Sequence, residues 1–93
     1  MSSGKVRRST SFHGRVQGVG FRATVQSIAR MHRVSGWVRN EADGSVRCIA
    51  EGIGTDLDAF HDAILVRMDA FVTSYRSSES EASDEYRAFV IRD

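Results

Sequence analysis

A glycine-rich stretch that ends in an arginine is the part of the chain whose residue types suggest chemistry. It reads Gly14-Arg15-Val16-Gln17-Gly18-Val19-Gly20-Phe21-Arg22. Glycine has no Cβ, so this backbone can bend tightly and bring its N–H groups close to a bound group. A helical pattern follows at once, and the unpaired N–H groups and positive dipole end of a helix start favour an anion. Because Arg22 adds a permanent cation with paired donors, the stretch predicts a phosphate site, with a plain turn and a solvated Arg22 as the alternative.

The glycine spacing excludes two common phosphate-binding motifs and resembles a third. The P-loop needs GxxxxGK followed by Ser or Thr, and the dinucleotide fingerprint needs GxGxxG, whereas these glycines stand at 14, 18 and 20 and precede Phe21 and Arg22. The stretch instead resembles the acylphosphatase signature. The family's second block, a Gly-Trp-Val run ending in Asn before a turn, is matched by Gly36-Trp37-Val38-Arg39-Asn40 and Asp43-Gly44-Ser45-Val46. The resemblance covers essentially the whole chain and is strongest between residues 14 and 52.

The resemblance implies an enzyme that hydrolyses acyl phosphates to a carboxylate and inorganic phosphate without a metal or another cofactor. It implies that Arg22 binds the phosphate, that Asn40 positions the attacking water, and that the two side chains meet between the first loop and the second strand. The loop residues that would surround the phosphate are Arg15, Val16, Gln17, Gly18, Val19, Gly20 and Phe21. Chemistry permits these roles, because a carboxylate leaves without a general acid and phosphoryl transfer depends mainly on positioning and charge stabilisation.

Two sites depart from the family pattern, and other interpretations stay open. His32-Arg33-Val34 replaces the usual Leu-Gly-Leu, and Arg33 would cost about 1 kcal/mol if it kept a left-handed glycine conformation. The usual Gly-Pro after the second helix is absent, because the chain has no proline.

Asn40 could simply begin a turn. The alternatives for the whole chain are an anion-binding module without turnover, a relative of the acylphosphatase-like domains of larger maturation enzymes, and a single-stranded RNA binder.

The remaining residues predict the elements that would position this site. Alternating patterns indicate strands over 6–13, 36–40, 46–51, 71–76 and 86–92. Helical spacing relates Phe21, Val25, Ile28, Ala29 and His32, and later Leu57, Phe60, Ile64, Leu65 and Met68. Asp43-Gly44 indicates a hairpin turn. This order predicts an α+β fold, a ferredoxin-like α/β sandwich of βαββαβ type with an antiparallel sheet and both helices on one face.

Several local features add detail to that arrangement. Gly52 and Gly54 are expected to end the third strand, and Thr55 is expected to cap the second helix. The four acidic residues and four serines between Ser77 and Glu85 indicate a solvated loop. Residues 6–93 are expected to form one acylphosphatase-like domain after a flexible N-terminus over 1–5.

Composition narrows the partners and the compartment. The chain is 41% hydrophobic with a net charge of +1, so no basic field argues for nucleic acid or an anionic membrane. The single cysteine, Cys48, excludes an internal disulfide, and no apolar run approaches a signal core or the ~20 residues of a membrane span. We therefore expect a cytoplasmic monomer whose partners are the acyl phosphate and its product.

The sequence indicates no second catalytic or metal-binding site among the other polar side chains. His13, His32 and His61 have no carboxylate or cysteine at metal-ligand spacing, so they are expected to be structural or surface residues and no metal site is predicted. Trp37 is expected to be a core residue rather than a platform for a ligand.

Overall fold

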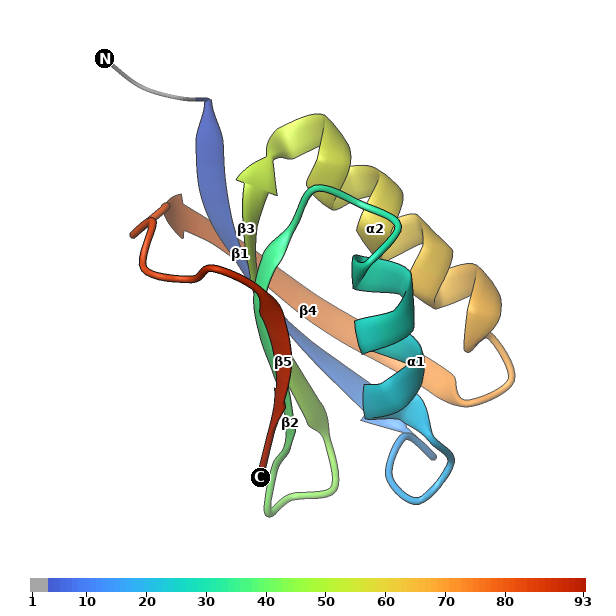
Figure 1. Ribbon diagram of the computed structural model, residues 1–93. Coiled ribbons are helices and arrows are strands. Elements are labelled where there is room, and N and C mark those ends of the chain that lie inside the picture. Colours follow the sequence, from blue (N-terminus) through green and yellow to red (C-terminus); the bar gives the residue numbers. More distant parts are fainter. Residues whose placement is uncertain (1–3) are drawn as a thin grey trace.

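The computed structural model describes residues 4–93 as one five-stranded sheet with two helices. The elements are β1 (Lys5–Gly14), α1 (Phe21–Ala29), β2 (Ser35–Asn40), β3 (Val46–Ile53), α2 (Gly54–Arg67), β4 (Val72–Glu81) and β5 (Phe89–Arg92). The strand order is β4-β1-β3-β2-β5. Both helices lie on one face of the sheet, as Figure 1 shows. The predicted sandwich architecture is therefore confirmed.

The sheet is mixed rather than wholly antiparallel. β1 pairs antiparallel with β3 and β4, and β2 pairs antiparallel with β3. The short β5, however, runs parallel to β2, with Gly36 opposite Phe89 and Arg39 opposite Arg92. This edge strand brings the C-terminal residues to the end of β2 that carries Asn40.

Alternation along the strands produces the core between sheet and helices. Phe12, Val38, Val46, Cys48 and Ala50 face the helices and are almost fully buried. α1 packs Phe21, Val25, Ile28 and Ala29 against them, and α2 packs Leu57, Phe60, Ile64 and Met68. The helical stripes predicted from spacing are confirmed, except that α1 ends at Ala29, before His32, and that Leu65 is only partly buried.

The second half of the chain corrects three predictions. Ser77–Glu81 belongs to β4 and is not a loop, because it pairs with β1 from Thr10 to Val6. Its polar pattern suits an exposed edge strand, where backbone pairing rather than apolar burial forms the strand. β3 continues through Gly52 to Ile53, which leads directly into α2, so Thr55 lies inside the first turn and does not cap the helix.

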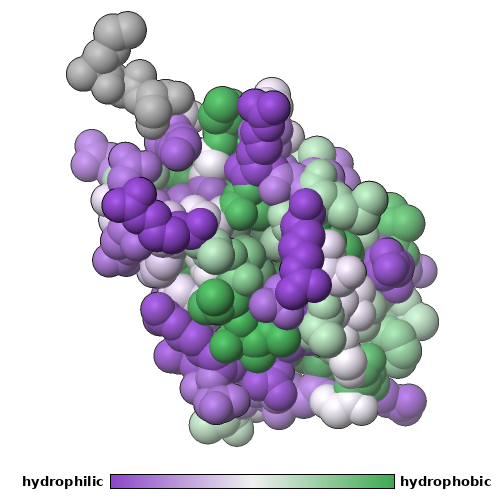
Figure 2. Space-filling view, in the orientation of Figure 1, coloured by the Kyte–Doolittle hydropathy of each residue, from purple (hydrophilic) through white to green (hydrophobic). Residues whose placement is uncertain are grey.

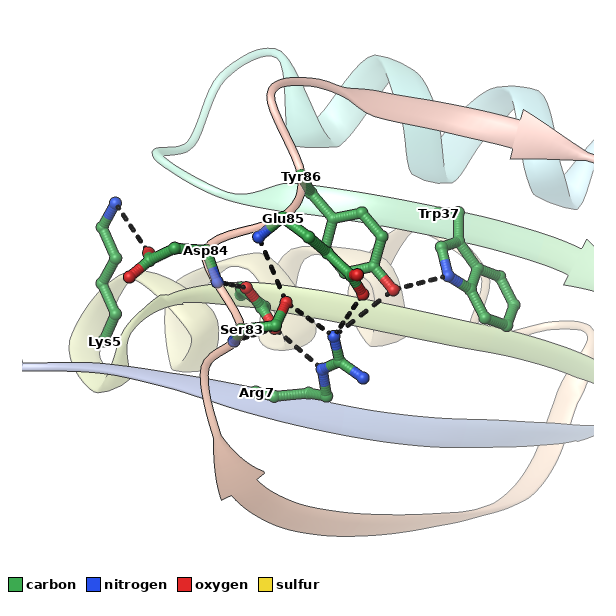
Figure 3. A network of polar contacts seen from close by, with 8 residues as sticks. Lys5, Arg7, Trp37, Ser83, Asp84, Glu85 and Tyr86 are labelled. Atoms are coloured by element: carbon green, nitrogen blue, oxygen red, sulfur yellow. Dashed lines mark hydrogen bonds and ion pairs between the residues drawn. The ribbon is translucent and has the colours of Figure 1, made fainter.

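The segment between β4 and β5 is also ordered by side-chain contacts. The Glu51 carboxylate, almost fully buried, accepts hydrogen bonds from the Arg7 Nε, the Ser83 N–H and hydroxyl, and the Asp84 N–H at 2.8 to 3.0 Å. Arg7 also donates to Glu85, and the Trp37 indole donates to the Tyr86 hydroxyl. Figure 3 shows these side chains converging from β1, β2 and the connecting segment. We call this group the Glu51 cluster.

The remaining expectations concern the ends and the surface of the molecule. Lys5 already belongs to β1, and the expectation of a flexible N-terminus over residues 1–3 falls outside the described residues. Figure 2 shows a mixed face, with hydrophobic side chains in the region that β5 occupies in Figure 1 and also on the side where the helices lie. Neither described helix has the length and apolar character that a membrane span requires.

Candidate active site

The glycine-rich segment forms a loop that is anchored at its start and buried in its middle. The Arg15 N–H donates to the Phe71 carbonyl at 2.9 Å, and the Val16 side chain is 1% exposed. Gly18 and Gly20 have φ angles of +77° and +75°, which other residues rarely adopt. Because these two glycines adopt the left-handed conformation within three residues, the loop turns back towards the start of α1, as the glycine spacing suggested.

The N-terminus of α1 is left without a cap of its own. Gly20 is the N-cap residue, so no side chain bonds the first N–H groups, and the first turn holds no acidic residue. α2, in contrast, carries Asp56 in its first turn. In the described chain, no capping or first-turn side chain therefore neutralises the positive end of the α1 dipole, which points at the loop. Such a helix end favours an anionic ligand.

The Gln17 side chain ties this loop to the hairpin between β2 and β3. Its amide nitrogen donates to the Glu41 carbonyl at 2.7 Å and to the Ser45 carbonyl at 2.9 Å. Gln17 was predicted to surround the phosphate, and the structure shows its amide nitrogen bonded to the hairpin carbonyls. The side chain thus holds the loop in place relative to Asn40, which directly precedes Glu41.

Arg22 projects from the first turn of α1 towards the C-terminus of the chain. Its guanidinium donates to the Arg92 carbonyl at 3.3 Å and lies 3.9 Å from the Asp93 carboxylate. One third of the side chain is exposed, so its remaining donors are open to a ligand. The contact depends on β5 lying beside β2.

Asn40 ends β2 opposite Val46, on the helix-covered face. The hairpin that follows is held by Asp43, whose carboxylate accepts hydrogen bonds from the Ser45 hydroxyl at 2.6 Å and the Ser45 N–H at 2.9 Å. These bonds hold the pKa of Asp43 below its usual range. A charged Asp43 therefore keeps the hairpin, and with it the end of β2, in a defined position.

Arg22 and Asn40 line the same open pocket of about 200 Å³. Of the seven predicted loop residues, Val16, Gly18, Gly20 and Phe21 also line it, whereas Arg15, Gln17 and Val19 do not. Ala23 and Ile91 complete the wall. The sequence analysis missed both, and for Ile91 no local pattern could have indicated it, because it reaches the pocket only through the pairing of β5 with β2.

The other reactive side chains lie away from this pocket. Burial raises the pKa of Cys48 to about 12, so its thiol stays protonated beneath the helices. Burial, together with the charge of Arg8, lowers the pKa of His61, which stacks on Phe12 and contacts Tyr75 edge to face. Over residues 4–93, no three His, Cys, Asp or Glu side chains gather as a metal-binding group.

Comparison with known proteins gives consistent matches over the whole fold. Residues 9–91 match the family profile described as Acylphosphatase. A protein named Acylphosphatase from Salinibacter ruber is 42% identical, with 99% of each chain covered, and one from Bacillus velezensis is 44% identical, covering 84% of this chain and 88% of its own. The crystal structure of acylphosphatase from Bacillus subtilis superposes with a TM-score of 0.85 at 33% identity, covering 95% of this chain and 99% of its own.

Proposed function

The chain belongs to the acylphosphatase family, whose members hydrolyse acyl phosphates, and we propose that in this chain Arg22 binds the phosphoryl group while Asn40 positions the attacking water. The observation that carries the proposal is that both side chains line one pocket at the uncapped N-terminus of α1. The remaining steps follow from the chemistry of the substrate.

The loop and Arg22 stabilise the charge of the phosphoryl oxygens. N–H groups from the Gly18–Phe21 turn and the start of α1 provide fixed dipoles, and the guanidinium provides a permanent charge with two parallel donors. Because these groups are held before the substrate arrives, they need little reorganisation as charge shifts in the transition state. The Arg92 carbonyl, which accepts from Arg22 at 3.3 Å, orients the guanidinium.

Asn40 prepares the water for in-line attack. Its amide carbonyl accepts a hydrogen bond from the water and directs an oxygen lone pair towards phosphorus, opposite the leaving carboxylate. An amide does not titrate, so this positioning is independent of pH over the physiological range. As the water oxygen bonds to phosphorus and the P–O bond to the acyl group breaks, the carboxylate takes the electron pair and leaves without a proton, and the protons of the water remain on the inorganic phosphate.

A substrate comparison tests this function. Purified protein is assayed with acetyl phosphate, benzoyl phosphate and p-nitrophenyl phosphate, and rapid turnover is expected for the first two only. The ester's phenolate is a poorer leaving group, and the pocket offers it no general acid. Equal or faster hydrolysis of the ester would contradict the proposal and indicate a general phosphatase.

Arg22→Lys tests the phosphate-binding role. Lysine keeps the charge but loses the planar pair of donors, so inhibition by inorganic phosphate and turnover should weaken together, each by about tenfold or more. Arg30→Lys, at the residue that directly follows α1, is the matched control. If Arg22→Lys bound phosphate and turned over substrate as well as the parent does, Arg22 would not be the phosphate ligand.

A further inference from the structure

A row of arginines crosses the face of the sheet that the helices leave uncovered. In order across the sheet, the residues paired in register are Arg76 on β4, Ser11 on β1, Arg47 on β3, Arg39 on β2 and Arg92 on β5. Paired residues point to the same face, and the neighbours Phe12, Val38 and Cys48 are buried on the opposite one. All four arginines of this row, which we call the arginine row, therefore point away from the helices.

Such an arrangement is unfavourable for the sheet itself. Arg39 lies directly opposite both Arg47 and Arg92, and like charges in such pairs destabilise a sheet. Part of the row has a structural role, because Arg39 and Arg92 stack on the Trp37 ring with guanidinium carbons 4.8 and 5.0 Å from its centroid. Trp37 is accordingly buried, but on the uncovered face rather than in the main core.

Stacking on Trp37 does not explain the other two arginines. Arg47 and Arg76 are exposed, and among residues 4–93 neither has a carboxylate within ion-pair distance. Arg39, by comparison, pairs with Glu41 at 3.1 Å. The row therefore presents more positive charge than the fold needs.

The acidic residues on the face of the arginine row lie beside Arg7 and Arg39 and not beside Arg47 or Arg76. Within the described strands, the register places Glu51 as the one acidic residue on the uncovered face, and it is buried against Arg7. Asp56, Asp58 and Asp62 belong to α2, and Glu79 pairs with Arg8 on the helix side. On the uncovered face, acidic side chains therefore pair with Arg7 and Arg39, whereas the described residues give Arg47 and Arg76 no acidic partner.

We propose that this face binds single-stranded nucleic acid, with phosphates along the arginine row. The row spans four strand spacings, about 19 Å at ~4.8 Å each, which suits a linear polyanion better than a small anion. A duplex fits poorly, because the sheet is wider than a major groove of about 12 Å. The guanidinium planes stacked on Trp37 also offer surfaces on which unpaired bases stack, a contact that an acidic peptide does not use.

Salt-dependent binding of an oligonucleotide tests the proposal. A fluorescein-labelled 12-nucleotide RNA without self-complementarity is titrated with the protein, and anisotropy is followed at several salt concentrations. Four phosphate contacts predict a slope of log K against log salt of about −2.8. The double variant Arg47→Gln/Arg76→Gln should reduce the slope by about 1.4 and weaken binding by about tenfold at 0.15 M salt.

A matched double variant distinguishes binding at the arginine row from a general effect of the protein's net charge. Arg30→Gln/Arg67→Gln removes the same charge from the helix side, at the C-terminal ends of α1 and α2, and should leave the slope unchanged. Equal weakening by both doubles, absence of RNA binding at low salt, or tighter binding of a poly-glutamate peptide of equal charge would each overturn the proposal. Poly-glutamate binding that depended on Arg47 and Arg76 would assign the face to an acidic protein instead.

Folding and catalysis provide the internal control. Because the double variant relieves the like-charge pair of Arg47 with Arg39, its melting temperature should be unchanged or higher. Its turnover of acetyl phosphate should equal that of the parent, since neither arginine lines the catalytic pocket. RNA binding lost together with stability or turnover would mean that the row is structural, and would also overturn the proposal.

Discussion

The Glu51 cluster and the Arg22–Asn40 pocket lie towards opposite ends of the central strands and use polar groups in opposite ways. Glu51 pairs with Ser35 at the start of β2, and Asn40 ends the same strand five residues later, about 17 Å away. In the cluster, each buried polar atom has a partner within the protein. In the pocket, the helix start has no side-chain cap and Arg22 keeps one third of its surface exposed.

The difference shows where this small chain keeps polar groups for stability and where it keeps them for a ligand. A buried carboxylate is stabilising only when its hydrogen bonds are complete, because desolvation otherwise costs several kcal/mol. A binding site needs the reverse, since donors already satisfied by the protein are not available to a phosphate. Substitutions should therefore affect stability at one end and turnover at the other.

The largest expected effect is on turnover, from Asn40→Ala. Loss of the amide that orients the water should lower kcat by about 10²–10³, the scale measured when one preorganised polar group is removed. Inhibition by inorganic phosphate should change by less than about twofold, because Arg22 and the loop remain. Glu41→Ala, the next residue in the same hairpin, is the control. A folded Asn40→Ala variant with near-normal kcat would reduce Asn40 to a turn residue.

The next largest effect is on stability, from Glu51→Gln. The glutamine amide has one acceptor oxygen instead of two, so either the bond from Asp84 or the bonds from Ser83 and Arg7 are lost, and the free energy of unfolding should fall by about 1–3 kcal/mol in urea denaturation. Turnover per folded molecule should not change. Glu79→Gln breaks an exposed pair with Arg8 and should cost less than about 1 kcal/mol. Equal losses from both variants would remove the distinction between the cluster and an ordinary surface pair.

Gln17→Leu tests whether, at the pocket end, hydrogen bonds completed within the protein serve turnover. It removes the two bonds from the loop to the Glu41 and Ser45 carbonyls, so Asn40 should be held less well relative to the phosphate. We expect kcat to fall by about tenfold with a much smaller change in phosphate inhibition. Gln26→Leu, which removes the 3.3 Å bond from the other glutamine to Phe89, is the control. Equal changes in kcat and phosphate inhibition would mean that Gln17 shapes the cradle rather than positions Asn40.

The smallest effect concerns acid pH. Burial raises the pKa of Glu51, but the bonds from the Ser83 N–H, Arg7 and the Ser83 hydroxyl outweigh it and hold the pKa below its usual value of 4.5. A carboxyl whose pKa is lower in the folded state contributes stability above the unfolded value and loses it as pH falls through the folded value. The stability difference between the parent and Glu51→Gln should therefore shrink as the pH falls below the usual value of 4.5. A difference independent of pH would show that the charge of Glu51 is not what stabilises the cluster.

The sequence predicted the first half of the chain better than the second. Between Gly14 and Ile53, apolar alternation, the Asp43-Gly44 turn and the glycines identified the loop, α1, β2 and β3. Residues 77–81 were misassigned to a loop, because β4 is held by backbone pairing with β1 and carries little apolar periodicity. Arg33 avoids the strain expected for a glycine position, since Asp84 is the only described residue other than glycine with a positive φ.

The sequence by itself determined the family, the order of the elements and the two side chains, Arg22 and Asn40, that we assign to catalysis, because these depend on local spacing and on motifs. Tertiary structure alone decided which distant residues became neighbours. The parallel pairing of β5 with β2 brings Ile91 to the pocket and the Arg92 carbonyl to Arg22. Strand register aligns four arginines that are far apart in the chain. Such contacts are set by which strands pair and in what register, and local sequence patterns carry little of that information.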